Sequence, residues 1–299
     1  MTINQHNRCY LGAALAALLL AYAAHAAPLP TGAGSITVEI DGTPIEVHTY
    51  KPRRYAGGAL LLTLHGVGRN AAGYRNHATP LAERHGFLVA APLFDRARFP
   101  TWRYQAGGVV RSANQSVSGT LEPEPEEQWT GRLLLRIVEA IRTIESTPTL
   151  AYYLLGHSAG GQALTRVAGL MPTGARRIII ANPGSYLWPA RDLRFPDGFG
   201  DLPERWSNDE ALRRYLAQPV TLLLGTADIH QDADLVMRAG AVAQGANRLE
   251  RGTNTYRAAQ ALAQARGWEF NWRLVEVPDV GHSAAQMFRS DAAMAALAP

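Results

Sequence analysis

One serine lies in a pattern that can make its hydroxyl a nucleophile. Residues 156–160 read GHSAG, which matches G-x-S-x-G, and they lie between an apolar run and a helical pattern. A sharp turn from strand to helix exposes such a serine, and the flanking glycines let neighbouring backbone pass without a clashing Cβ. The pattern therefore predicts that Ser158 is a nucleophile held on such a turn.

A base and an acid follow at the ends of two further apolar runs. Asp228 comes shortly after residues 220–224, and His282 shortly after residues 272–277. A serine hydroxyl needs an imidazole to accept its proton and a carboxylate to orient that imidazole. We therefore predict a catalytic set of Ser158, Asp228 and His282.

Other acids and histidines compete for these roles. Asp232 and Asp234 are expected to cap the next helix, and Asp279 is only three residues from His282, so Asp228 is favoured. His157 is expected to pack beneath the turn. His230 is the remaining histidine that lies near a predicted site residue.

The loop HGVG at residues 65–68 follows the apolar run 59–64 and has two interpretations. Gly66, Gly68 and Ala71, with Asp95 further on, resemble a dinucleotide-binding loop. Alternatively, the peptide N–H groups of Val67 and Ala159 form an oxyanion hole for a tetrahedral intermediate. A hairpin precedes the loop, whereas a dinucleotide loop normally opens the first βαβ unit, so the oxyanion hole is favoured.

The elements that must position these residues alternate between strands and helices. Residues 35–40 and 45–50 form a predicted hairpin around Asp41-Gly42. Strands are predicted at 59–64, 87–93, 150–155, 178–181, 220–224 and 272–277, and helices at 71–85, 127–145, 158–170, 209–216, 255–266 and 283–297. Continuous apolar strands alternating with helices predict an α/β fold with a mostly parallel central sheet, an antiparallel N-terminal hairpin and helices on both faces.

Two long connections, at about 95–128 and 182–208, follow predicted strands at their carboxyl ends, where open α/β sheets bind ligands. The substrate-binding residues that we expect there are aromatic: Trp102, Tyr104, Tyr186 and Trp188. The alternative is that these rings only pack the connections against the core.

The motif around Ser158, the His65-Gly66 loop, Asp228 and His282 together resemble the α/β-hydrolase superfamily. The order serine, acid, histidine is the one found in that superfamily. More narrowly, the chain from Ile36 onward is similar to the branch of secreted polyhydroxybutyrate depolymerases and feruloyl esterases. The resemblance implies the α/β-hydrolase fold and cleavage of carboxylic esters through an acyl-enzyme on Ser158. The alternatives are a serine peptidase of the same fold and a hydrolase-like binding protein without turnover.

The start of the chain predicts export. Residues 9–23 are nearly all apolar and Ala24-His25-Ala26 fits a cleavage site, so residues 1–26 are predicted to be a signal peptide and the protein to be secreted or periplasmic. A retained membrane anchor is the alternative. The one cysteine, Cys9, is the first residue of this run, so cleavage leaves no thiol for catalysis or for metal binding.

Composition and charge limit the number of domains and the classes of partner that we expect. With 47% hydrophobic and 18% charged residues, residues 27–299 are predicted to form a single catalytic domain. The net charge is +4 and the arginines are scattered, so no nucleic-acid partner is expected. No metal or cofactor is expected, and no membrane contact after signal cleavage. The expected partner is a small or oligomeric ester, and the oligomeric state stays open.

Overall fold

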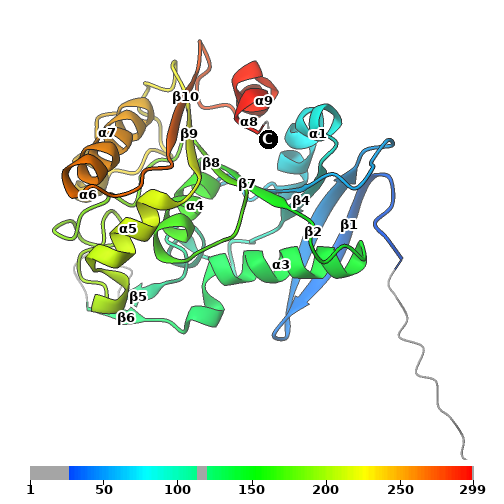
Figure 1. Cartoon of the computed structure of the whole chain (residues 1–299), viewed down its shortest axis with the longest axis horizontal. Coiled ribbons are helices and arrows are strands. Elements are labelled where there is room, and N and C mark those ends of the chain that lie inside the picture. Colours follow the sequence, from blue (N-terminus) through cyan, green and yellow to red (C-terminus); the bar gives the residue numbers. More distant parts are fainter. Residues whose placement is uncertain (1–26, 113–119, 298–299) are drawn as a thin grey trace, which may run out of the picture.

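An eight-stranded mixed sheet forms the centre of the molecule (Figure 1). The computed structural model describes residues 27–112 and 120–297, so the predicted signal peptide lies outside the described residues. The strand order is β1-β2-β4-β3-β7-β8-β9-β10. β1 pairs antiparallel with β2, and β2 pairs antiparallel with β4, whereas the remaining pairs are parallel. The predicted α/β fold class is confirmed.

The strands of the sheet follow the predicted apolar runs closely. They are β1 (Gly32–Ile40), β2 (Thr43–Lys51), β3 (Leu60–Leu64), β4 (Leu88–Pro92), β7 (Tyr152–His157), β8 (Arg177–Ala181), β9 (Val220–Gly225) and β10 (Arg273–Val277). Two short strands, β5 (Val110–Ser112) and β6 (Leu121–Pro123), form a separate antiparallel pair. They lie within the first long connection, where the sequence shows no strand periodicity.

Helices lie at all the predicted places. Two of them differ clearly in extent from the prediction, and two helices of four residues each, at Thr101–Tyr104 and Ala239–Val242, lie outside the predicted ranges. The helices are α1 (Ala71–His85), α2 (Thr101–Tyr104), α3 (Thr130–Ile144), α4 (Ala159–Leu170), α5 (Asp209–Ala217), α6 (Ala239–Val242), α7 (Arg248–Arg266), α8 (Ala284–Arg289) and α9 (Asp291–Ala296). α7 begins seven residues before the predicted 255, because the Asn247 side chain caps it by accepting from the Glu250 N–H. The helix predicted at 283–297 is two helices, since Ser290 ends α8 and caps α9.

The central strands of the sheet are buried on both faces. α1, α8 and α9 lie together on one side of it, and α3, α4, α5 and α7 supply the other side (Figure 1). Along β3, Leu60 and Leu62 point into one core and Leu61 into the other. Because side chains alternate between the faces of a strand, a strand buried on both faces must be apolar throughout. This explains the continuous apolar runs of the sequence.

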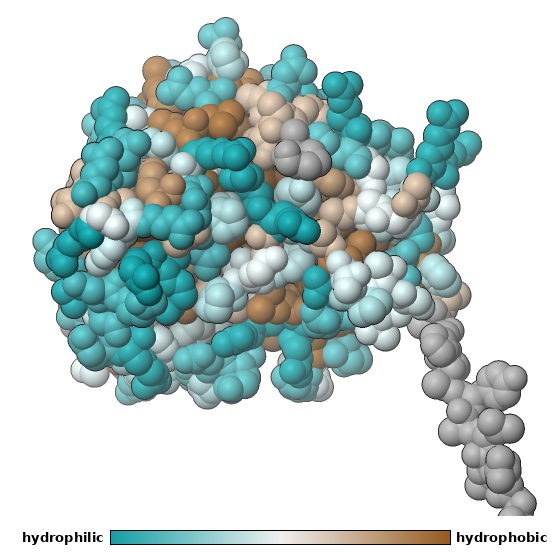
Figure 2. Space-filling model, in the orientation of Figure 1, coloured by the Kyte–Doolittle hydropathy of each residue, from teal (hydrophilic) through white to brown (hydrophobic). Residues whose placement is uncertain are grey.

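The surface is mainly polar on the side shown in Figure 2, where hydrophobic patches are small and interrupted by hydrophilic residues. No helix among residues 27–112 and 120–297 has both the length and the apolar character to cross a membrane.

The central position of β3 leads to a prediction about stability. Leu62 is fully buried, so Leu62→Ala removes apolar contacts and leaves a cavity, and we expect a loss of about 2 to 5 kcal/mol in the free energy of unfolding. Met237 is 61% exposed, so Met237→Ala should change it by no more than about 0.5 kcal/mol. Urea unfolding measures both. Equal losses in the two variants would contradict this description of the core.

Candidate active site

Three side chains meet at the carboxyl edge of the sheet. Ser158 follows β7, Asp228 follows β9 and His282 follows β10. The Nε2 atom of His282 lies 3.0 Å from the Ser158 Oγ, and its Nδ1 atom lies 2.7 Å from Oδ2 of Asp228. With Nδ1–H donating to the buried Asp228 carboxylate, Nε2 is free to accept the serine proton. The structure thus brings together the three residues that the sequence predicts as catalytic.

Close backbone contacts hold Ser158 on its turn. Its φ of 57° and ψ of −117° lie in a region that L-residues rarely adopt. A Cβ on Gly156 would collide with the Gly160 carbonyl oxygen, and a Cβ on Gly160 would collide with that of Leu64. The G-x-S-x-G spacing is therefore a steric requirement, because β3, β7 and the first turn of α4 cross without room for side chains.

His157 packs beneath this turn, as the sequence suggests. It is buried, and its Nδ1 atom lies 3.1 Å from the Tyr74 hydroxyl. Burial, together with the neighbouring His282, lowers the pKa of His157 well below its ordinary value, so the ring is neutral. The Tyr74 hydroxyl, whose pKa burial raises, therefore donates to it. The ring centroids of His157 and His282 lie 4.7 Å apart. The hydrogen-bonded pair of Tyr74 and His157 therefore packs against the imidazole of His282, which faces Ser158.

The loop after β3 is fixed by buried polar contacts. Burial lowers the pKa of His65 to about 4, so this ring is also neutral. The Phe94 N–H donates to its Nε2 at 3.1 Å, which leaves Nδ1–H to donate to the Gly66 carbonyl at 3.0 Å. The Arg69 N–H donates to the same carbonyl at 3.1 Å. Two donors thus fix the orientation of the peptide that joins Gly66 to Val67.

That orientation bears on the predicted oxyanion hole. The peptide unit is planar, so the Val67 N–H points away from the side on which the Gly66 carbonyl is held. A Cβ on Gly66 would lie 3.6 Å from the Ser158 Cβ, which places the loop against the nucleophile. Ala159 is the first residue of α4, so its N–H has no acceptor within the helix. Of the two residues predicted to supply oxyanion donors, Ala159 thus directly follows Ser158 in the chain, and Val67 lies on the loop that packs against Ser158.

The other interpretation of this loop finds less support. Asp95, which a dinucleotide would need for its ribose, forms an ion pair with Arg98 at 2.5 Å.

Within residues 27–112 and 120–297, no group of His, Cys, Asp or Glu side chains is arranged to hold a metal ion.

Asn182 joins the loops that carry Asp228 and His282. Its Oδ1 atom accepts from the Gly225 N–H at 2.9 Å, and its Nδ2 donates to the Gly281 carbonyl at 3.3 Å. Beside it, the Ala227 N–H donates to the Val280 carbonyl at 3.0 Å. These contacts hold the ends of β9 and β10 together, so Asp228 and His282 meet although 54 residues separate them.

The competing acids have other partners. Asp279 is exposed, and its backbone N–H donates to the Thr226 hydroxyl at 2.9 Å. The expectation that Asp232 and Asp234 cap the next helix is wrong, because α6 begins only at Ala239 and no side chain caps it. Asp232 instead binds Arg248 and accepts from the Asp234 N–H at 2.9 Å. His230 is exposed.

Known structures share this architecture. Poly(aspartic acid) hydrolase-1 from Sphingomonas sp. KT-1 is 32% identical with a TM-score of 0.79, over 87% of this chain and 96% of that one. A poly(3-hydroxybutyrate) depolymerase from Bordetella parapertussis is also 32% identical with a TM-score of 0.79, over 90% and 96% of the two chains. The chain belongs to the α/β-hydrolase superfamily.

More distant structures show the same fold. A siderophore hydrolase from Aspergillus nidulans superposes on this α/β-hydrolase with a TM-score of 0.51 at 12% identity, over 89% of this chain and 94% of that one. No protein-family model and no curated protein sequence matches the chain.

Two of the four predicted substrate-binding aromatics are buried in this α/β-hydrolase. Tyr104 and Tyr186 have no exposed surface, so the expectation that they contact substrate is wrong in this structure. The Tyr104 hydroxyl donates to the His65 carbonyl at 2.7 Å and so supports the loop after β3. Tyr186 lies beneath the acid, where burial and the charge of Asp228 raise its pKa. Both rings pack their connections against the core.

The other two predicted aromatics stay partly exposed. Trp102 lines a shallow depression, and the guanidinium of Arg111 lies 5.2 Å from its ring. Trp188 lies on the second long connection, where its backbone N–H donates to the Asp197 carbonyl at 2.9 Å. These two rings remain available to a substrate of the α/β-hydrolase.

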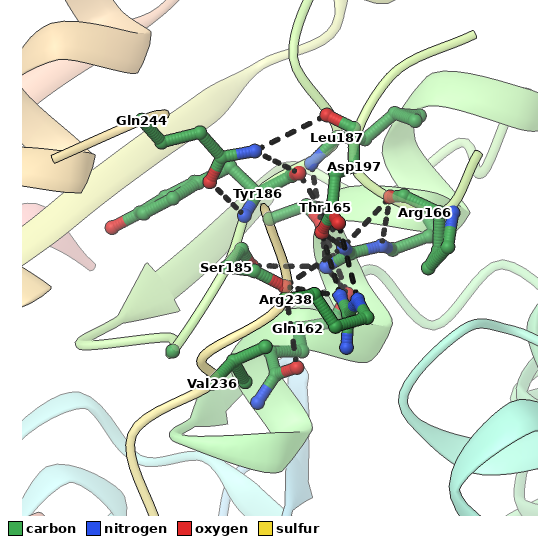
Figure 3. A network of polar contacts seen from close by, with 12 residues as sticks. Gln162, Thr165, Arg166, Ser185, Tyr186, Leu187, Asp197, Val236, Arg238 and Gln244 are labelled. Atoms are coloured by element: carbon green, nitrogen blue, oxygen red, sulfur yellow. Dashed lines mark hydrogen bonds and ion pairs between the residues drawn. The ribbon is translucent and has the colours of Figure 1, made fainter. Parts of the chain in front are cut away.

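A buried ionic network ties the nucleophile helix to two connections (Figure 3). Arg166 on α4 donates to the Ser185 carbonyl at 2.9 Å and lies 3.6 Å from Asp197. Burial lowers the pKa of Arg166 to about 10, so it is still charged at neutral pH. Asp197 also accepts from Arg238 at 2.6 Å. The network thus joins α4, the 182–208 connection and the segment before α6.

Sequence reasoning missed Asn182 and Arg248. Asn182 directly follows the apolar run 178–181 and is the first residue after β8, so its place at a strand end was the available signal. Arg248 precedes the predicted start of its helix, and its contacts come from residues that only folding brings near.

The contacts of Asn182 generate a prediction. Asn182→Ala removes two hydrogen bonds of a fully buried side chain, so we expect a loss of about 1 to 3 kcal/mol in the free energy of unfolding and a lower kcat for hydrolysis. Urea unfolding and steady-state kinetics measure these effects. Asn271→Ala is the matched control, since Asn271 is exposed and donates to the Ala217 carbonyl away from the site. The prediction fails if the Asn182 variant behaves like the control.

Proposed function

We propose that this protein hydrolyses carboxylic esters through an acyl-enzyme on Ser158. The observation that carries the proposal is the continuous set of contacts from the Ser158 hydroxyl through His282 to the buried Asp228, at 3.0 and 2.7 Å. A strained serine turn and a rigid loop beside it supply the setting that such a reaction needs.

In the proposed mechanism, His282 acts first as a base and then as an acid. It accepts the Ser158 proton through Nε2 as Oγ attacks the carbonyl carbon. The oxygen of the tetrahedral intermediate accepts hydrogen bonds from the N–H groups of Val67 and Ala159. The intermediate collapses as His282 protonates the departing alcohol. Water, deprotonated by His282, then attacks the acyl carbon. The bond from this carbon to the Ser158 Oγ breaks as His282 returns the proton to Oγ, which releases the carboxylic acid and restores Ser158.

We base a preference for an apolar substrate on the connection that begins with Asp228. The connection from β9 to α7 exposes three large apolar side chains: Ile229 at 50%, Met237 at 61% and Val242 at 44%. Together with Trp102 and Trp188, they provide surface for a bulky or oligomeric ester. Of the two structures that are 32% identical, the Bordetella enzyme is named for a polyester and the Sphingomonas enzyme for poly(aspartic acid), whose units are joined by amide bonds. Amide cleavage by Ser158, His282 and Asp228 is therefore the second candidate.

We also propose that residues 1–26 direct export and are removed, which leaves the enzyme secreted or periplasmic. The protein is expected to act without a metal or cofactor, with its ester substrate as partner. N-terminal sequencing of the protein recovered outside the cytoplasm tests the cleavage site after Ala26.

Removal of the nucleophile tests the proposed reaction. Ser158→Ala should abolish turnover of aryl esters, because the hydroxyl forms the acyl-enzyme, and in studied triads such losses reach about 10⁶-fold in kcat. A fluorophosphonate should label the natural protein at Ser158 and leave this variant unlabelled. Asp228→Asn should be severe and Asp279→Asn mild. Residual activity above a tenth in the Ser158 variant would overturn the proposal, and preference for peptide amides or poly(aspartic acid) would favour the second candidate.

Trp188 tests the expected size of the substrate. If its exposed surface contacts a large acyl or alcohol group, Trp188→Ala should lower kcat/KM for a bulky aryl ester more than for an acetate ester. A hydrophobic contact of this kind is worth about 1 to 3 kcal/mol, or roughly 10- to 200-fold. Kinetics on the two esters measure the difference. Equal losses on both would show that Trp188 serves only to pack its loop.

A further inference from the structure

A buried arginine lies against the acid of the triad. Arg248 is 1% exposed, and its Nη1 atom lies 3.4 Å from Oδ1 of Asp228. The other carboxylate oxygen of Asp228, Oδ2, faces Nδ1 of His282 at 2.7 Å. Each oxygen of the Asp228 carboxylate therefore has its own partner, and the two contacts together fix the orientation of this group.

A second carboxylate holds the arginine in place. Asp232 accepts from Nη1 of Arg248 at 2.8 Å and from Nη2 at 2.7 Å, which is the two-point geometry that a guanidinium favours. The pKa of Asp232 is lowered to about 2, chiefly by the hydrogen bonds from Arg248. Asp232 is therefore ionised wherever the enzyme is expected to work. Arg248 is the first residue of α7, and Asp232 thus holds its side chain at the start of this helix.

We propose that Arg248 is a positioning residue for the hydrolysis: held by Asp232, it orients the Asp228 carboxylate toward His282. The inference rests on the proposed function, in which His282 is the base. We refer to Arg248, Asp228 and Asp232 as the arginine clamp. The clamp links α7 to the end of β9, and the Leu249 N–H adds a long contact to the Asp228 carbonyl at 3.4 Å.

The members of the clamp act on His282 with opposite signs. The groups around the imidazole are Asp228 at the end of β9, neutral His157 at the end of β7, Arg248 on α7 and Asp232 on the connection after β9. The positive charge of Arg248 opposes the protonated imidazole. The negative charge of Asp232 favours the protonated imidazole, because Asp232 and His282 interact electrostatically. A variant that lacks one clamp charge must therefore move the His282 titration in a direction set by that charge.

The test is the pH dependence of kcat/KM in two variants. Arg248→Met should lower kcat at least tenfold and raise the midpoint of the acid limb by about 0.5 to 1 pH unit, because the opposing charge is gone. Asp232→Asn weakens the anchor of Arg248 but leaves its charge, so it should lower kcat by less than Arg248→Met does, and it should lower that midpoint. Arg248→Lys should restore the midpoint without restoring kcat, since an ammonium lacks the planar geometry of the guanidinium.

The matched control is Arg257→Met, the same substitution at an exposed position of α7. It should leave both kcat and the midpoint unchanged. Circular dichroism establishes that each variant is folded. If Arg248→Met does not fold, the downward shift expected for Asp232→Asn and the behaviour of Arg248→Lys still decide the matter.

A second readout does not depend on turnover. NMR titration of the imidazole resonances, with His282 assigned from a His282→Gln variant, measures the same midpoints directly. Shifts of opposite sign in the Arg248→Met and Asp232→Asn proteins support the clamp. Unchanged midpoints, or shifts of the same sign, overturn it. If the unaltered protein cleaves no ester while the imidazole midpoints of the two variants still shift in opposite directions, the proposed function is rejected and the clamp is retained.

Discussion

The strained backbone of Ser158 is the constraint on which the site depends. A residue in such a conformation costs on the order of 1 to 3 kcal/mol, so the surrounding structure must hold it in place. Here the Ser158 N–H donates to the Ala181 carbonyl at 3.0 Å, and every residue of α4 is buried. The glycines at 156 and 160 allow β3, β7 and α4 to approach closely enough for this. The turn is stable because it lies at the centre of the sheet rather than on a surface loop.

From that fixed point the other groups are positioned through polar contacts between loops. His65 and Arg69 fix the peptide before Val67, and Asn182 fixes the distance between the ends of β9 and β10. Burial keeps His65 and His157 neutral, so each can accept one hydrogen bond at a defined nitrogen. The only imidazole in contact with the Ser158 hydroxyl among the described residues is that of His282.

Buried arginines connect the site to the rest of the fold. Arg166, Arg248 and Arg251 are each about 1% exposed. Arg166 and Arg248 bind carboxylates, and Arg251 donates to the carbonyl groups of residues 184, 236 and 245. A buried charge is costly unless it is hydrogen-bonded, so these contacts tie the long connections to α4 and α7. The connections that carry Asp228 and Trp188 are thus anchored to the folded core at these points.

The sequence alone determined the fold class and the three side chains that meet at the proposed active site. Both depend on local patterns: apolar runs long enough for buried strands, glycines at fixed spacing around Ser158, and an acid and a histidine just beyond strand ends. Tertiary structure decided which side chains contact them. The burial of Tyr104 and Tyr186, the bridge made by Asn182 and the pairing of Arg248 with Asp228 and Asp232 all depend on segments that are distant in the chain or separated by a turn. Local periodicity records whether a residue faces a core, but not which partner it meets there, because that depends on how the carboxyl ends of the parallel strands converge.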